Sequence, residues 1–147
     1  MNNRKITMFA PSVCERFTAH KPSDIPPTLI HEINHMFYLE FAGTVLPVWL
    51  SDGLAENMAR PGRKPGKIDR KYLIYAYKDT EFMQKSHEYV RQCYRNSYLF
   101  THLLLKKKGK RSVMEFLKEF RKHKDRKTYD ALFEKLCSEL HVGASDQ

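Results

Sequence analysis

Residues 31–35 read HEINH, so the sequence places two histidines four residues apart with a glutamate between them. The surrounding segment has the pattern of an amphipathic helix, because its apolar residues recur at helical spacing. Residues four apart lie on one face of a helix, so both imidazoles should project to the same side. The apolar positions are Leu29, Ile30, Ile33, Met36, Phe37 and Phe41.

The sequence also indicates where this helix begins and ends. Ser23 or Asp24 suits the N-cap, and the prolines at positions 26 and 27 fit a first turn, whose N–H groups have no intrahelical partner. Gly43 suits the left-handed conformation that ends many helices. The HEINH segment therefore lies in the middle of the predicted helix.

Two imidazoles on one helix face can bind a single zinc ion, and the glutamate between them can reach a water on that ion. His31 and His35 are accordingly predicted metal ligands, and Glu32 is the predicted general base of a hydrolytic reaction. A hydrolytic zinc site usually has three protein ligands, so one ligand has to come from elsewhere in the chain. The alternative is a histidine pair that is buried or solvated without a metal.

A length of 147 residues and 41% hydrophobic residues suit one domain, residues 1–147. No apolar run approaches the roughly 20 residues that span a bilayer, and the first residues are polar. These features predict a soluble, cytoplasmic protein. Cys14, Cys93 and Cys137 are odd in number and form no CxxC pair, so we expect reduced cysteines. Cys93 and Cys137 fall on apolar helical faces, so we expect them to be packing residues and not ligands or nucleophiles.

The chain is basic, with 26 Lys and Arg against 17 Asp and Glu, a net charge of +9. Such a surface favours acidic partners, whether nucleic acid, an anionic membrane or an acidic substrate. The basic residues gather in 60–67, 106–111 and 121–127. Because these segments look like loops or helix ends, a solvated surface is the simpler explanation, and nucleic-acid binding is the alternative.

Strands are expected to be few. Residues 4–10 alternate apolar and polar side chains and form the best strand candidate. A single strand makes no sheet, so either residues 72–77 pair with it or it lies against the first helix. Residues 11–22 resemble a loop.

Four more helices follow from apolar spacing and end signals. Pro47 fits the start of the first, and the Pro-Gly pairs within residues 61–66 fit its end. Gly109 is expected to end the longest helix, and Ser112 with Glu115 forms a capping box for the helix after it. The predicted helices are Val48–Ala59, 86–108, 112–120 and 128–140.

Residues 49–56 read WLSDGLAE and follow closely on the first helix. Together with the HExxH motif, this segment resembles the gluzincin metallopeptidases, in particular the peptidase MA-like group, whose second motif reads approximately W-L-x-E-G-x-A-E. The resemblance implies that Asp52 is the third zinc ligand and that Glu56, one turn further on, orients a zinc-bound histidine. The reverse assignment of these two carboxylates stays open.

Asp52 departs from the family pattern, which has glutamate at this position. Aspartate is one methylene shorter, so either the second helix approaches the metal more closely, or Asp52 binds weakly or through water. An inactive descendant of the family is therefore an alternative.

Residues 94–100 read YRNSYLF and are similar to the family's Y-x-x-S-Y-x-F stretch, which leads into a long helix packed behind the active site. The resemblance implies that Tyr94 donates a hydrogen bond to the oxyanion. The alternative is that Tyr94 is a core aromatic on an amphipathic helix.

We therefore expect a mainly α zincin-like core with an α+β remnant. It should contain an active-site helix, a second ligand-bearing helix, a long backing helix, two C-terminal packing helices and at most one to three short strands near the N-terminus. The expected function is zinc-dependent (Zn2+) hydrolysis of a peptide or protein substrate. The alternatives are an inactive gluzincin-like binding or regulatory module, associated with nucleic acid through its basic loops, and a helical protein without metal.

Overall fold

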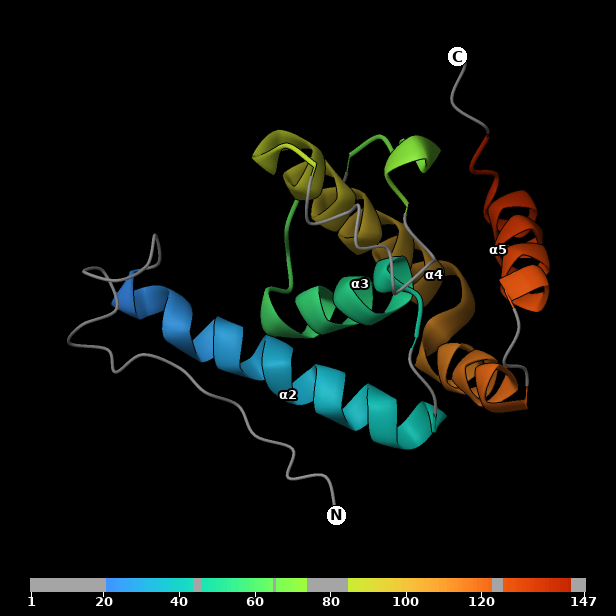
Figure 1. Cartoon of the computed structure of the whole chain (residues 1–147), viewed down its shortest axis with the longest axis horizontal. Coiled ribbons are helices and arrows are strands. Elements are labelled where there is room, and N and C mark those ends of the chain that lie inside the picture. The colour runs from blue at the N-terminus through green and yellow to red at the C-terminus, as the bar shows by residue number, and fades with distance from the viewer. Residues whose placement is uncertain (1–20, 44–45, 65, 74–84, 123–125, 144–147) are drawn as a thin grey trace.

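The computed structural model describes residues 21–43, 46–64, 66–73, 85–122 and 126–143. Within these ranges the chain is mainly α-helical and no residue lies in a strand, which confirms the expected helical class (Figure 1). The elements are η2 (Pro22–Asp24), α2 (Ile25–Ala42), α3 (Val48–Ala59), η3 (Arg70–Tyr72), α4 (His87–Lys122) and α5 (Arg126–Leu140).

The predicted strand at residues 4–10 and most of the predicted strand at residues 72–77 lie outside the described residues. The second strand prediction is wrong at its first residue, because Tyr72 closes the 3-10 helix η3. The side chain of Asp69 caps this short helix by accepting a hydrogen bond from the backbone N–H of Lys71. Most of the predicted loop at residues 11–22 is also outside the described ranges, and Pro22 already belongs to η2.

The helix that carries the HExxH motif begins and ends close to the predicted positions. At its end Gly43 has a φ of 64° and donates its N–H to the carbonyl of Leu39 at 3.0 Å, which confirms the predicted stop. At its start the predicted side-chain cap is wrong. The Asp24 carboxylate accepts the backbone N–H of Lys21 at 2.9 Å, so it caps the 3-10 helix before α2.

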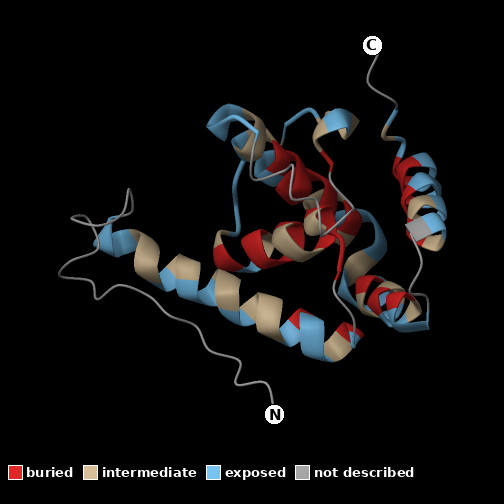
Figure 2. Cartoon of the chain, in the orientation of Figure 1, coloured by how far each residue is buried: buried red, intermediate tan, exposed pale blue. Residues whose placement is uncertain are grey.

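Helix α3 has the predicted bounds and lies between α2 and α4 (Figure 1). It is buried along most of its length because both flanking helices pack on it (Figure 2). At Gly53 the approach of α4 is so close that a Cβ would lie 2.4 Å from the carbonyl oxygen of Ser97. Only glycine fits this crossing without a shift of the backbone.

Helix α4 contains the predicted break at Gly109, which has φ 76° and ψ 161°. The helix resumes directly after it, so Ser112 lies inside helical structure and the predicted capping box is wrong. The predicted start is confirmed to within one residue, since Ser86 Oγ accepts the backbone N–H of Tyr89 at 3.2 Å. The part of α4 after Gly109 and helix α5 are the two expected C-terminal helices.

An aromatic cluster joins three helices in the core. The ring centroids of Trp49 in α3 and Phe100 in α4 lie 5.1 Å apart, and Phe133 in α5 lies 5.5 Å from Trp49 and 5.6 Å from Phe100. Such contacts stabilise a core beyond the area they bury. None of the helices in the described ranges combines the length and apolar character needed to cross a membrane.

Cys93 and Cys137 are buried free thiols, as predicted for packing residues, whereas Cys14 lies outside the described residues. Burial raises the pKa of each of the two thiols to about 11. Both therefore stay protonated at neutral pH, which disfavours roles as nucleophiles or metal ligands.

Gly53→Ala is expected to destabilise the fold by about 1–3 kcal/mol, because the new methyl group would overlap the backbone of α4. Chemical unfolding followed by circular dichroism measures the change. Gly143→Ala is the matched control, since a Cβ at Gly143 meets nothing within 4 Å. Equal stabilities for the two variants would contradict the close crossing.

Candidate metal centre

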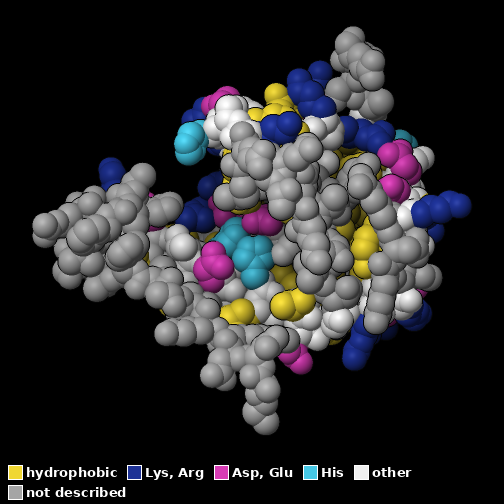
Figure 3. Space-filling view, in the orientation of Figure 1, with side chains coloured by type: hydrophobic (Ala, Val, Ile, Leu, Met, Phe, Trp, Pro, Cys, Tyr) yellow, Lys and Arg dark blue, Asp and Glu magenta, His cyan; other side chains and the backbone are white. Residues whose placement is uncertain are grey.

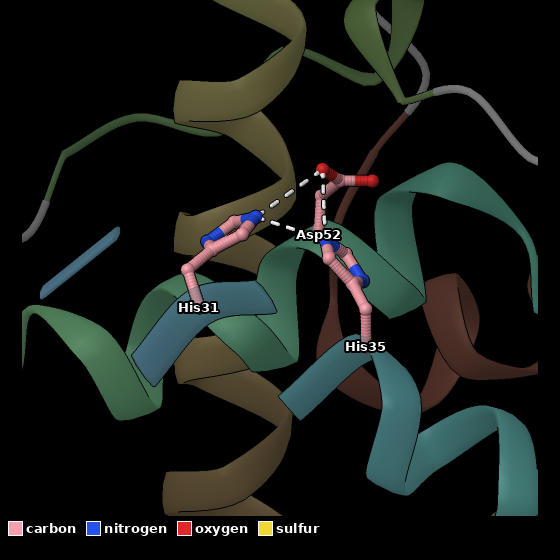
Figure 4. Close-up of side chains that lie close together, drawn as sticks. All are labelled: His31, His35 and Asp52. Atoms are coloured by element: carbon pink, nitrogen blue, oxygen red, sulfur yellow. Dashed lines mark hydrogen bonds and ion pairs between the residues drawn. The ribbon is translucent and has the colours of Figure 1, made fainter. Parts of the chain in front are cut away.

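The structure brings the three predicted ligands together between α2 and α3. His31 and His35 project from one face of α2, and Asp52 projects from α3 toward them (Figure 4). The two Nε2 atoms are 2.9 Å apart, and Asp52 Oδ1 lies 3.7 Å from His31 Nε2 and 3.6 Å from His35 Nε2. Three potential ligand atoms thus surround one small space.

The size of this space fits zinc. A circle through three atoms at these separations has a radius of about 2.0 Å, and zinc binds histidine nitrogen and carboxylate oxygen at about 2.0–2.2 Å. One ion could therefore contact all three atoms without movement of either helix. The shorter side chain of Asp52 reaches this position because α3 packs directly on α2.

The other ring nitrogen of each histidine also has a partner. His31 Nδ1 lies 3.2 Å from Glu56 Oε2, and His35 Nδ1 lies 2.8 Å from Ser51 Oγ. When each Nδ1–H donates to its partner, Nε2 keeps a lone pair for a metal. The geometry thus favours Asp52 as ligand and Glu56 as the residue that orients His31, over the reverse assignment.

Two arginines that the motif analysis did not identify fix the position of Glu56. Its carboxylate forms ion pairs with Arg60 Nη1 at 2.8 Å and with Arg63 Nη2 at 2.5 Å. Burial raises the pKa of Glu56, but the hydrogen bond with His31 and the charges of the two arginines outweigh it, and the net pKa is lowered. Glu56 is therefore ionised at neutral pH.

Burial and the nearby carboxylates together set the protonation of the two histidines when no metal is bound. Burial lowers the pKa of His31, but hydrogen bonds to Asp52 and Glu56 and their charges raise it to about 9. For His35, burial dominates over the charge of Asp52 and lowers the pKa. At neutral pH His31 is thus an imidazolium that can donate its Nε2–H to the neutral His35, and a metal would displace this proton.

The centre opens into a cavity of about 1100 Å³, and Glu32 and Tyr94 both line it. The histidine and acidic side chains are visible together on the face drawn in Figure 3. Tyr94 lies on α4 and is 40% exposed, so it is not a core aromatic. Burial, followed by the charges of Asp52 and Glu32, raises the pKa of Tyr94, which keeps its hydroxyl protonated as a hydrogen-bond donor.

The sequence did not identify Ser51, whose hydroxyl contacts His35. Its position directly before the predicted ligand Asp52 could have suggested a place beside the centre. Arg60 and Arg63 belong to the basic cluster 60–67, which the sequence suggested to be solvated surface. The structure shows instead that part of this cluster pairs with Glu56 and lines the cavity.

Comparison of the chain with models of protein families, with curated proteins and with solved structures gave no match. The arrangement of the side chains and the two sequence motifs are therefore what indicates a metal centre.

Replacing Asp52 by alanine should weaken zinc binding by more than about 100-fold, because a direct ligand is lost. Glu56→Gln should lower the zinc affinity by about 10–100-fold or less, since Glu56 contacts the ligand His31 and the two arginines and none of the three potential ligand atoms belongs to it. Competition with a chromophoric chelator measures both affinities. Glu115→Ala, which removes an exposed acid paired with Lys118, is the control. A larger loss of zinc affinity in the Glu56 variant than in the Asp52 variant would make Glu56 the ligand and Asp52 the orienting residue.

In the metal-free protein, His31 should titrate near pH 9 and His35 below its ordinary 6.5. A raised pKa in the folded state means that His31 contributes stability fully below about pH 6.5 and loses it as the pH rises through about 9. Zinc affinity should increase over the same range, because binding releases the His31 proton. NMR of the imidazole protons and zinc titrations at several pH values measure these effects. Two histidines that both titrate near 6.5 would contradict the coupling to the carboxylates.

Proposed function

We propose that the protein is a zinc-dependent peptidase with His31, His35 and Asp52 as ligands and Glu32 as general base. The observation that carries the proposal is the convergence of three ligand atoms on a space of zinc size at the floor of an open cavity. The HExxH and WLSDGLAE motifs support an assignment to the gluzincin, peptidase MA-like metallopeptidases and a zincin-like catalytic core.

Zinc with three protein ligands and an open position acts as a Lewis acid and makes water a nucleophile near neutral pH. Glu32 follows His31 directly on α2 and lines the same cavity, which supports it as the general base. In the proposed reaction Glu32 accepts the proton of the attacking water and then gives it to the leaving amine.

Tyr94 supplies a second polar group to the reaction. Its hydroxyl stays protonated and its side chain lines the cavity from α4, opposite the helix that carries the histidines. A donor in this position would stabilise the negative charge that develops on the carbonyl oxygen of the peptide.

A second candidate function is a metal-binding module that binds peptides without hydrolysis. The observation that favours it is the aspartate at position 52, where the related motif has a glutamate. Zinc bound at one equivalent, with no turnover across a peptide library, would support this candidate over the peptidase.

Glu32→Gln should retain zinc and lower hydrolysis by about 10²–10⁴-fold, because the amide cannot accept a proton. His35→Ala should instead lose the zinc. Elemental analysis measures the metal, and a library of internally quenched peptides measures cleavage. Glu40→Gln, at an exposed position of the same helix, is the matched control. Full activity of the Glu32 variant would exclude it as the base.

A further inference from the structure

The cavity beside the candidate metal centre has a strongly basic wall. Its positive residues come from two elements, the segment after α3 and the first half of α4. In Figure 3, Lys and Arg side chains lie next to the histidine and acidic side chains. The basic residues that line the cavity are Arg60, Arg63, Lys64, Arg91 and Arg95.

Three of these five charges are already paired. Arg60 and Arg63 form ion pairs with Glu56, which itself contacts His31. Arg91 pairs with Glu88, its neighbour three residues earlier on α4. These arginines thus have roles within the protein and are less available to a ligand.

Lys64 and Arg95 remain. Neither forms an ion pair with any acidic residue of the described ranges, and both are exposed. Nη2 of Arg95 lies 3.4 Å from the position that a Cβ at Gly66 would occupy, so its guanidinium rests against the segment that carries Lys64. Two cations without an ion pair in the described part of the chain therefore lie in the same part of the wall.

The position of this pair relative to the reacting groups follows from α4. Tyr94 directly precedes Arg95, and both line the cavity. A ligand that contacts Tyr94 can therefore extend toward Arg95 with its adjacent part. A volume of about 1100 Å³ matches the upper end of ligand pockets, about 300–1000 Å³, and leaves room for more than the bond to be cleaved.

We propose that Lys64 and Arg95 form a carboxylate-binding subsite that selects peptides with a negative charge close to the scissile bond. The guanidinium and ammonium groups match the charge of a carboxylate, which would serve as the acidic partner that neither side chain has among the residues that the structure describes. The carboxylate could belong to a Glu or Asp side chain or to the peptide C-terminus. That such a peptide is a substrate rests on the proposed peptidase function. Binding of the peptide at the subsite does not depend on that function.

Binding to the zinc-loaded Glu32→Gln protein tests the subsite without turnover. The probes are hexapeptides with an uncharged fluorophore and amidated C-termini, in which the only charged residue is one Glu at a different position in each peptide, and their uncharged Gln counterparts. A Gln peptide with a free C-terminus tests the second source of carboxylate. At ~50 mM salt we expect at least one Glu peptide to bind about five- to tenfold more tightly than its Gln counterpart, as two exposed charge pairs would give.

Lys64→Ala combined with Arg95→Ala should make the affinities for a Glu peptide and its Gln counterpart equal. Lys64→Arg combined with Arg95→Lys should keep the preference for the Glu peptide. Lys106→Ala with Lys107→Ala is the matched control, because it removes the same charge from exposed positions of α4 outside the cavity. Equal affinities for every Glu and Gln pair and for the free and amidated C-termini, or a preference that survives the double alanine variant, would overturn the proposal.

The outcomes separate this proposal from the peptidase proposal. A preference for Glu peptides without cleavage by the wild-type protein would support the subsite and reject the peptidase proposal. Cleavage without any preference for a carboxylate would support the peptidase proposal and reject the subsite. A preference only for the free C-terminus would assign the carboxylate to the peptide end. A single-stranded oligonucleotide that displaces the peptide and needs the same two residues would overturn the peptide assignment in favour of nucleic acid.

Discussion

The packing of α3 against two helices at once is the constraint on which the candidate centre depends. Gly53 lies against the backbone of Ser97 in α4, while its neighbour Asp52 reaches the histidines of α2. Consecutive residues of one helix thus serve packing on one side and ligand placement on the other. Because aspartate is short, its oxygen reaches the space between the imidazoles only while α3 stays close to α2.

The distribution of charge explains how two carboxylates one helical turn apart can take different roles. Glu56 is buried and neutralised by Arg60 and Arg63, so it serves best as an acceptor for His31 Nδ1. Asp52 has no basic partner other than the histidines in the ion pairs of the described residues, and its oxygen faces both Nε2 atoms. The arginines thereby favour Asp52 as the carboxylate that an ion would meet.

Local signals predicted most of the helices, and the two motifs with their family resemblance predicted the three residues that the structure brings together as candidate ligands. Pro47 and the following apolar spacing gave the bounds of α3, and Gly43 gave the end of α2. The position of Ser51 beside His35 depends on how α2 and α3 pack against each other. The spacing of apolar residues along each helix does not predict this packing. The cap prediction at Asp24 failed because another backbone N–H competed for its carboxylate, and Ser112 was misplaced because the helix restarts directly after the glycine break.

The short contact between the two Nε2 atoms has a consequence for the exchange of ions. In the metal-free protein the raised pKa of His31 allows its imidazolium to donate Nε2–H to Nε2 of the neutral His35. This hydrogen bond would keep the two imidazoles close together when no ion is bound. Binding of a metal would exchange the shared proton for the ion, so acid would favour release of the ion.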